Sequence, residues 1–164
     1  MEHYDEILFQ TAQETLESLA FLFSFSGEEN EDVFADSQFS AHVIFTGHFS
    51  GQLLLCISKS ILSELVQNML GIEGDEKISI EKMHDGLKEL LNVVCGNLLP
   101  ALAGKQEIFH IAVPTIIPLE EYKELIQKKS SFSRARLDLE NGKAVFTLLI
   151  EGQVISEALI GANA

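Results

Sequence analysis

The sequence has few basic residues, and this scarcity limits the partners that it can bind. Only 11 Lys and Arg stand against 25 Asp and Glu, which gives a formal net charge of −14. Proteins that bind DNA or RNA hold the phosphate backbone with clusters of Lys and Arg. Here the basic residues are scattered or form only short pairs, such as Lys128-Lys129. We therefore expect no nucleic-acid partner, and we assign the acidity to solubility.

A disulfide framework and a long apolar run are also missing. Cys56 and Cys95 lie far apart in mostly apolar stretches, where a free Cys behaves as a small hydrophobic residue. No apolar run approaches the roughly 18 residues that a membrane-spanning helix needs. The first residues are acidic, unlike the basic start of a signal peptide. These absences predict a cytoplasmic protein without membrane contact.

Signatures of the common catalytic and metal sites are absent as well. No P-loop, dinucleotide fingerprint or nucleophile elbow occurs in the chain. The histidines have no H-x-x-x-H or Cys/His spacing, so we expect no metal site and no cofactor bound by this chain itself. These histidines are His3, His42, His48, His84 and His110.

The length and composition are those of an ordinary globular protein. The chain has 164 residues, of which 46% are hydrophobic and 22% are charged. A chain of this size forms one domain with a substantial core. We therefore expect a single domain over residues 1–164.

Two helices are predicted in the first half of the chain. Apolar residues recur every three to four positions from Asp5 to Phe25, which is the period of an amphipathic helix. A second helix runs to Leu70, where Gly71 provides the usual C-terminal residue. Either Ser58 or Ser60 can cap its N-terminus.

A third and longer helix follows. Ser79 is a suitable N-terminal cap, and the apolar pattern continues to about Gly104. Pro100 lacks the N–H group that would bond one turn back, so we expect a bend there. Farther along, the pattern of Pro118–Lys129 is ambiguous and is compatible with a short helix in a long connection.

Alternating apolar and polar residues predict strands and two hairpins. Asn141-Gly142 is the strongest short hairpin signal in the chain. The order is helix, hairpin, two helices, strand, hairpin, which predicts an α+β fold with a mostly antiparallel sheet packed against long helices. The predicted strands are Phe39–Phe49, Gln52–Ile57, Glu107–Val113, Ser131–Glu140 and Lys143–Glu151.

The third predicted helix separates its apolar and polar residues. At about 100° per residue, Asp85, Glu89, Asn92 and Gly96 form one narrow stripe, spaced by four, three and four positions. The opposite face is apolar, and we assign it to the core. Its residues are Met83, Leu87, Leu90, Leu91, Val94 and Leu98.

The polar stripe alone does not establish a site. Exposed polar residues on an amphipathic helix are usually only a solvated face. Glycine inside a helix lowers its stability by about 0.5–1 kcal/mol relative to alanine, so the presence of Gly96 calls for an explanation. Packing of the helix end and close approach of another surface are both possible reasons. Asn97 lies nearer the buried flank, and we assign it to structural hydrogen bonding.

The stripe also fits a known signature. Asp85-x3-Glu89-x2-Asn92 matches the D/S-x3-E-x2-N signature of the CheC/CheX/FliY phosphatase family. The N-x3-G-N continuation from Asn92 to Asn97 resembles the CheX branch. The likeness covers roughly residues 39–104, and the segments before the signature that carry it are Val43–Gly47, Gly51–Leu55 and Leu65–Gly71.

This resemblance implies a phosphatase that hydrolyses the aspartyl-phosphate of a CheY-like response regulator. The phosphate and its Mg²⁺ would belong to the receiver domain of the partner. Asn92 would place its amide beside the phosphoryl group and orient the attacking water. Glu89 would pair with the active-site lysine of the receiver. Asp85, at the first position of the signature, and Gly96 would have supporting roles.

The first predicted helix departs from the two-site CheC pattern. Gln10-x3-Glu14-x2-Glu17 has a similar rhythm, but Glu17 stands where asparagine is required. A carboxylate there would repel phosphate, so we expect one site per chain, as in CheX, and a homodimer with two. Two alternatives remain at this point. One is a catalytically silent binding or scaffold module of a chemotaxis, flagellar-switch or other two-component system. The other is a regulatory dimerisation domain without a receiver partner.

Overall fold

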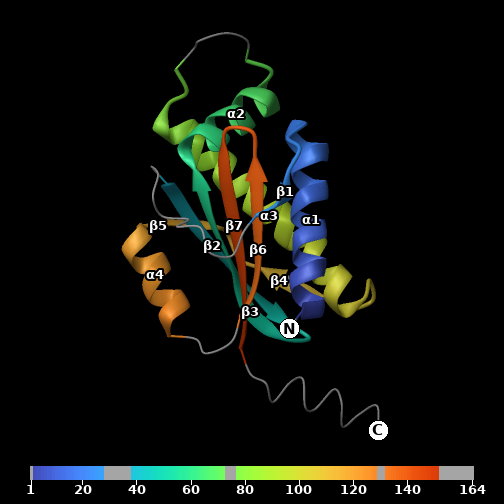
Figure 1. Cartoon of the computed structure of the whole chain (residues 1–164). Coiled ribbons are helices and arrows are strands. Elements are labelled where there is room, and N and C mark those ends of the chain that lie inside the picture. The colour runs from blue at the N-terminus through green and yellow to red at the C-terminus, as the bar shows by residue number, and fades with distance from the viewer. Residues whose placement is uncertain (1, 28–37, 73–76, 129–131, 152–164) are drawn as a thin grey trace, which may run out of the picture.

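A seven-stranded sheet forms the centre of the computed structural model, which describes residues 2–27, 38–72, 77–128 and 132–151 (Figure 1). The strand order is β1-β6-β7-β3-β2-β4, with β5 also paired to β2, and every pairing is antiparallel. The predicted α+β class and antiparallel sheet are therefore confirmed. The strands are β1 (Phe25–Ser26), β2 (Gln38–Gly47), β3 (Ser50–Ser58), β4 (Phe109–Ile111), β5 (Thr115–Ile117), β6 (Ser133–Leu139) and β7 (Gly142–Glu151).

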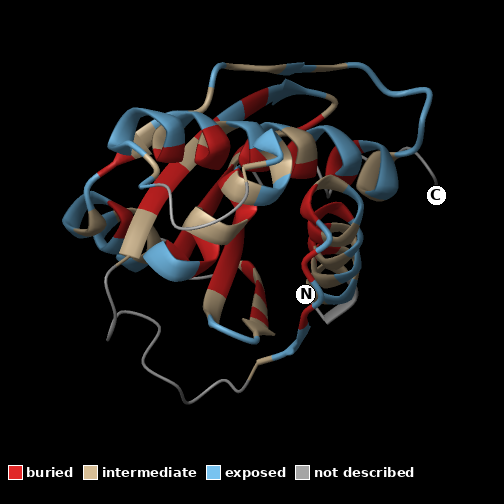
Figure 2. Cartoon of the chain, turned by 90° about the horizontal axis from the view of Figure 1, so that it is seen from above, coloured by how far each residue is buried: buried red, intermediate tan, exposed pale blue. Residues whose placement is uncertain are grey.

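Helices cover both faces of this sheet. Leu53 and Leu55 of β3 point into the main core with α1, α2 and α3, whereas Leu54 and Cys56 join a smaller core beneath α4. The buried residues accordingly run along the sheet and the inner sides of the helices (Figure 2). The described helices are α1 (Glu2–Ala20), α2 (Lys59–Leu70), α3 (Ile80–Ala103) and α4 (Leu119–Gln127), so the ambiguous segment forms a short helix.

The first helix is shorter at its C-terminal end than the sequence predicts. It ends at Ala20, and Phe21 adopts a left-handed conformation with φ 56°. The Asn68 side chain of α2 donates a hydrogen bond to the carbonyl of Ala20 at 2.7 Å, and the chain then enters β1. Phe23, which lies within the predicted helix, is 68% exposed. The prediction of a helix to Phe25 was wrong because contacts with α2 and the sheet edge end it earlier.

The predicted ends of the other two long helices are largely confirmed. The hydroxyl of Ser79 accepts a hydrogen bond from the Lys82 N–H at 3.2 Å and caps α3, and Gly71 closes α2 in the left-handed conformation. Ser58 occupies the N-cap position of α2, but its hydroxyl accepts from the Lys143 N–H of β7 at 3.0 Å instead. This serine therefore connects the helix to the sheet.

The second hairpin forms with its turn shifted by one position. Leu139 pairs with Gly142, so Glu140 and Asn141 are the turn residues instead of Asn141 and Gly142. A Cβ on Gly142 would lie 2.8 Å from the Cβ of Ser58. Gly142 is therefore needed for the close approach of the hairpin to α2, which no local turn signal shows.

The strand predicted over Glu107–Val113 is shorter in the structure, where only Phe109–Ile111 forms a strand, β4. A second short strand, β5, was not predicted and follows after a bulge. Phe45 of β2 pairs with Ile111 of β4, and His42 pairs with Thr115 of β5. Residues 112–114 thus oppose only residues 43 and 44, so one extra residue is accommodated on the edge. The Ala112 N–H donates to the Ile44 carbonyl at 2.9 Å and holds this bulge against β2.

Both cysteines are buried and free, in agreement with their assignment as small hydrophobic residues. Burial raises the pKa of Cys56 and of Cys95 from 9.0 to about 12.

Among the helices that the structure describes, none combines the length and the apolar character needed to cross a membrane.

Candidate functional site

The packing of α3 determines which of its residues reach the surface. The residues predicted to form its apolar face are all buried, and Gly86, Cys95 and Leu99 are buried beside them. With that face held against the main core, the opposite face points outward. Asp85, Glu89, Asn92 and Gly96 are all exposed, as the stripe predicts.

This stripe forms one wall of an open hollow of about 380 Å³. Asp85, Lys88, Glu89 and Asn92 line the hollow from α3, and residues 111–114 line it from the bulge between β4 and β5. The second wall was not predicted from the sequence. Pro114, which ends the predicted strand, was the available signal, but only the pairing of both short strands with β2 brings this segment to α3.

Two side chains at the centre of the stripe are unengaged. Within the described residues, neither Glu89 nor Asn92 makes a hydrogen bond or ion pair with another side chain. Lys88 lies near Asp85, with Nζ 3.9 Å from Oδ1, and the Asp85 side chain is 70% exposed. Exposed pairs of this kind contribute at most about 1 kcal/mol, so they break readily when a partner binds. The site can therefore offer a carboxylate and an amide to another molecule.

The two glycines of this helix serve different purposes. A Cβ on Gly86 would lie 2.5 Å from Cγ2 of Val66, so this glycine allows α2 to pack closely on α3. A Cβ on Gly96 would meet nothing within 4 Å. Packing against the described part of the chain therefore does not explain Gly96. Asn97 donates to the Thr15 hydroxyl of α1 at 3.4 Å, in agreement with a structural role.

A second hollow of about 330 Å³ adjoins the first. Asp85 and Glu89 border both hollows. The second hollow runs between α2 and α3 and is mainly apolar. Its other lining residues are Val66, Met69, Leu70, Lys82 and Gly86.

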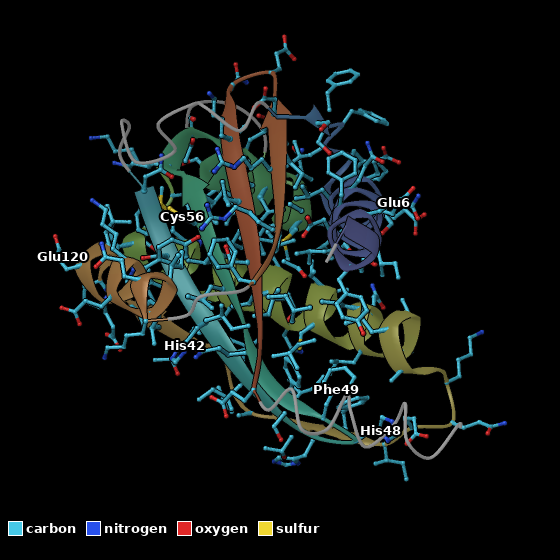
Figure 3. All side chains as sticks on the ribbon, turned by 60° about the horizontal axis from the view of Figure 1, so that its bottom comes forward. Glu6, His42, His48, Phe49, Cys56 and Glu120 are labelled. Carbon is cyan, nitrogen blue, oxygen red and sulfur yellow. The ribbon has the colours of Figure 1, made fainter. Side chains whose placement is uncertain are left out.

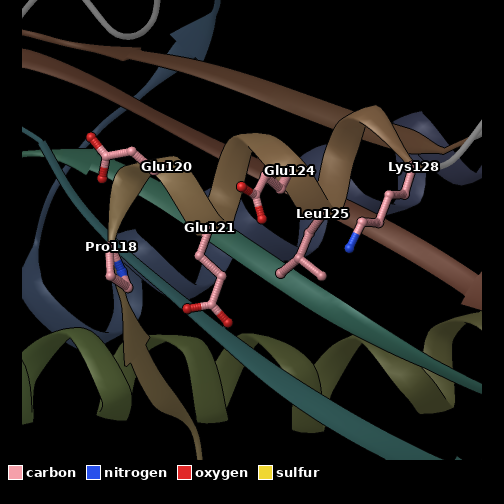
Figure 4. A pocket seen from close by; sticks show the side chains of 6 residues that line it. All are labelled: Pro118, Glu120, Glu121, Glu124, Leu125 and Lys128. Carbon is pink, nitrogen blue, oxygen red and sulfur yellow. The ribbon is translucent and has the colours of Figure 1, made fainter.

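A larger hollow of about 450 Å³ lies on α4, on the opposite face of the sheet (Figure 4). Glu120, Glu121 and Glu124 line it together with a single cation, Lys128. Three carboxylates disfavour an anionic ligand such as a phosphoryl group. None of the stripe residues lies in this hollow.

The described histidines do not gather into a site. Nδ1 of His42 lies 3.0 Å from a Gln52 side-chain oxygen, whereas Nδ1 of His48 lies 3.1 Å from a Glu107 carboxylate oxygen. The two rings occupy separate parts of the molecule (Figure 3). Within the described ranges, no three His, Cys, Asp or Glu side chains come close enough together to hold a metal ion.

The stripe has a chemistry that is suited to assisting a reaction on another molecule. An amide both donates and accepts hydrogen bonds without adding charge, so Asn92 can orient a water molecule beside an anion. The Glu89 carboxylate, three residues or about 4.5 Å along the helix axis from Asn92, can pair with a cation. The open hollow gives a second surface access to both groups.

A comparison with protein families identifies a match to this region. The family model described as "Chemotaxis phosphatase CheX" matches residues 39–135, which include the stripe and both walls of the first hollow. A search of curated proteins found no match.

Solved structures share the fold over nearly the whole chain. A chemotaxis protein CheX from Desulfovibrio desulfuricans superposes with a TM-score of 0.69 at 19% identity, covering 91% of this chain and 99% of that chain. CheX in a CheX–CheY–BeF3–Mg²⁺ complex from Borrelia burgdorferi gives 0.64 at 17% identity, covering 91% and 98%. FliY from Thermotoga maritima gives 0.61 at 16% identity, covering 95% and 91%. At such identities the likeness establishes the fold alone.

Proposed function

This chain belongs to the CheX family of chemotaxis phosphatases, and we propose that it accelerates hydrolysis of the aspartyl-phosphate of a CheY-like receiver domain. One observation carries the proposal. Glu89 and Asn92 stand in the order of the family signature on one exposed helix face, beside a hollow and without partners among the described residues. Side chains arranged in this way are available to a second protein.

Asn92 is the proposed catalytic residue. Phosphoryl transfer to water depends mainly on positioning the nucleophile in line with the leaving oxygen. The Asn92 amide would enter the phosphorylated site of the receiver, accept a hydrogen bond from the attacking water and fix its direction. A carboxylate at this position would repel the phosphoryl oxygens, so the neutral amide is the better group.

Glu89 is the proposed anchor. Its carboxylate would pair with the active-site lysine of the receiver, which fixes the register of the helix and hence the depth of Asn92. Asp85 and Gly96 support this docking: Asp85 continues the acidic stripe, and Gly96 leaves open space for the partner. The Mg²⁺ needed for the reaction would be carried by the receiver, and a CheX relative was crystallised with CheY, BeF3 and Mg²⁺.

The proposal includes one site per chain. In α1, Glu14 is exposed, but Glu17 supplies a carboxylate instead of the amide that a second site requires. A homodimer would then carry two sites, and it would act in the cytoplasm, where receiver domains are phosphorylated.

The test compares phosphate release from phosphorylated CheY-like receivers with Mg²⁺ in the presence of the wild-type chain and Asn92→Ala. We expect wild-type acceleration to fall by at least about tenfold in the variant, because the water loses its orienting group. Asn97→Ala, an amide on the same helix outside the hollow, serves as the matched control and retains the activity.

Other outcomes would replace the proposal. Binding of a receiver without faster phosphate release would indicate the catalytically silent module. Full activity of Asn92→Ala would show that the catalytic residue lies elsewhere. If neither free nor phosphorylated receivers bind, a regulatory dimerisation domain becomes the better description.

A further inference from the structure

The second hollow is a mainly apolar groove between α2 and α3, which is unexpected beside a polar site. Val66 is buried at its floor, and Gly86 permits the two helices to approach closely there. Leu70, at the last turn of α2, remains 55% exposed on its rim, although the core lies next to it. Apolar surface that stays open beside a reactive site is characteristic of binding surfaces.

The groove is continuous with the first hollow, which Asn92 lines. Asp85 and Glu89 line both, so no other element separates them. Gly86 lies six residues before Asn92, or about 9 Å along the helix axis. A transient signalling complex buries about 600 Å² on each partner, which corresponds to a disc of about 14 Å radius. A receiver centred on Asn92 therefore covers this groove.

The rim of the groove indicates the chemistry of its occupant. Asp85 and Glu89 lie on the side of the first hollow, and Lys82 contributes the one basic side chain among the residues that line the groove. Met69 is an adaptable side chain that can adjust to the shape of an inserted group. An apolar side chain surrounded by polar and charged neighbours fits this arrangement, with its apolar part against Leu70.

We propose that this groove is the specificity-determining half of the receiver-docking surface: it takes an apolar side chain that projects from the receiver beside its phosphorylated aspartate. This inference rests on the proposed function. Asn92 acts on a group that every receiver shares, whereas the groove reads a side chain that differs among receivers. Discrimination between receivers then lies mainly in docking and not in the chemical step.

The experiment measures the dissociation constant and the saturation kinetics of the same chains with a panel of CheY-like receivers carrying BeF3 and Mg²⁺ or phosphate. For the receiver that binds best, Leu70→Ser is expected to raise the dissociation constant about tenfold, because burial of the exposed leucine surface is lost. The rate at saturating receiver should stay unchanged, since Asn92 is untouched.

Two control variants make the result specific. Leu70→Met keeps an apolar side chain of similar volume and should retain wild-type affinity. Phe25→Ser removes a 74% exposed side chain from β1, which lies at the end of the sheet opposite β4. This variant should also bind as the wild type does. Circular dichroism of each variant checks that the fold is intact.

The outcomes separate the two proposals. If the wild-type chain accelerates dephosphorylation but Leu70→Ser binds equally well, the groove has no docking role while the phosphatase assignment stands. If Leu70→Ser lowers the saturated rate and leaves affinity unchanged, the inference is also wrong. If the wild-type chain neither binds nor accelerates any receiver of the panel, both proposals fail together.

Discussion

At the scale of single residues, Glu89 and Asn92 divide the proposed work between binding and chemistry. They lie three positions apart on the exposed face of α3, so both can reach one small area of a partner. An anchoring charge changes the affinity for the receiver, whereas a water-orienting amide changes the rate of the bound complex. Substitutions of the two residues should therefore have different kinetic effects.

Glu89→Gln is expected to raise KM for the phosphorylated receiver by about tenfold with a much smaller change in kcat, because the variant removes the anionic half of an interfacial charge pair. The measurement is the dependence of phosphate release on receiver concentration. Glu14→Gln, which removes an exposed carboxylate from α1, is the control for net charge and should behave like the wild type. A fall in kcat with unchanged KM would assign Glu89 to the chemical step instead.

At the scale of elements, the position of α3 determines the site, and α2 and the edge of the sheet complete it. Gly86 brings α2 against α3, and the Ala112–Ile44 hydrogen bond holds the bulge on the other side of the stripe. Bulges recur next to active sites because they redirect the chain without ending the sheet. Close helix packing and a bulged edge thus together form the two hollows.

Replacing each of the two glycines of α3 by alanine should change the free energy of unfolding in opposite directions. Gly86→Ala is expected to lower the free energy of unfolding by about 1–3 kcal/mol, because its Cβ collides with Val66 in a packed interface. Gly96→Ala should raise it by about 0.5–1 kcal/mol, since alanine is the better helix former and its Cβ meets open space.

Urea unfolding measures both changes, and receiver binding adds a second readout. Gly96→Ala should weaken binding of a BeF3-loaded receiver despite its greater stability, if a partner surface approaches here. A stabilised variant with unchanged affinity would show that Gly96 lies outside the contact.

At the scale of the whole molecule, the two buried thiols connect stability to pH. Their pKa is about 12 in the folded chain, against 9.0 without burial, because the interior disfavours a thiolate. Below about pH 9, Cys56 and Cys95 are protonated in both states and have no effect. As the pH rises from 9 towards 12, the unfolded chain loses these protons first, so unfolding becomes more favourable.

We expect the free energy of unfolding to fall by up to about 1.4 kcal/mol per pH unit for each thiol in this range. Urea unfolding between pH 8 and pH 10.5 measures the slope. Cys95→Ala lowers stability at every pH but should make the slope shallower, since one titrating group is gone. An unchanged slope in this variant would contradict the assignment to the thiol.

The class of the fold, most of the long elements and the exposed stripe could be predicted from the residues alone. The apolar period of α3 places Leu87, Leu90 and Val94 inside and therefore Glu89 and Asn92 outside, because a helix must bury its apolar face. The Ser79 cap and the Gly71 terminator were also sufficient to predict the ends of their helices. Their interactions are confined to one turn of helix, so they can be read from neighbouring residues.

The surroundings of the stripe could not be predicted in this way, because they depend on how the chain packs. The early end of α1, the shifted turn before Gly142 and the bulge at residues 112–114 all depend on contacts between segments distant in sequence. The same is true of the groove beside Leu70, which exists because Gly86 allows α2 to approach α3. Such contacts leave no periodic signal in the chain, so the sequence predicted the exposed stripe but not the hollows beside it.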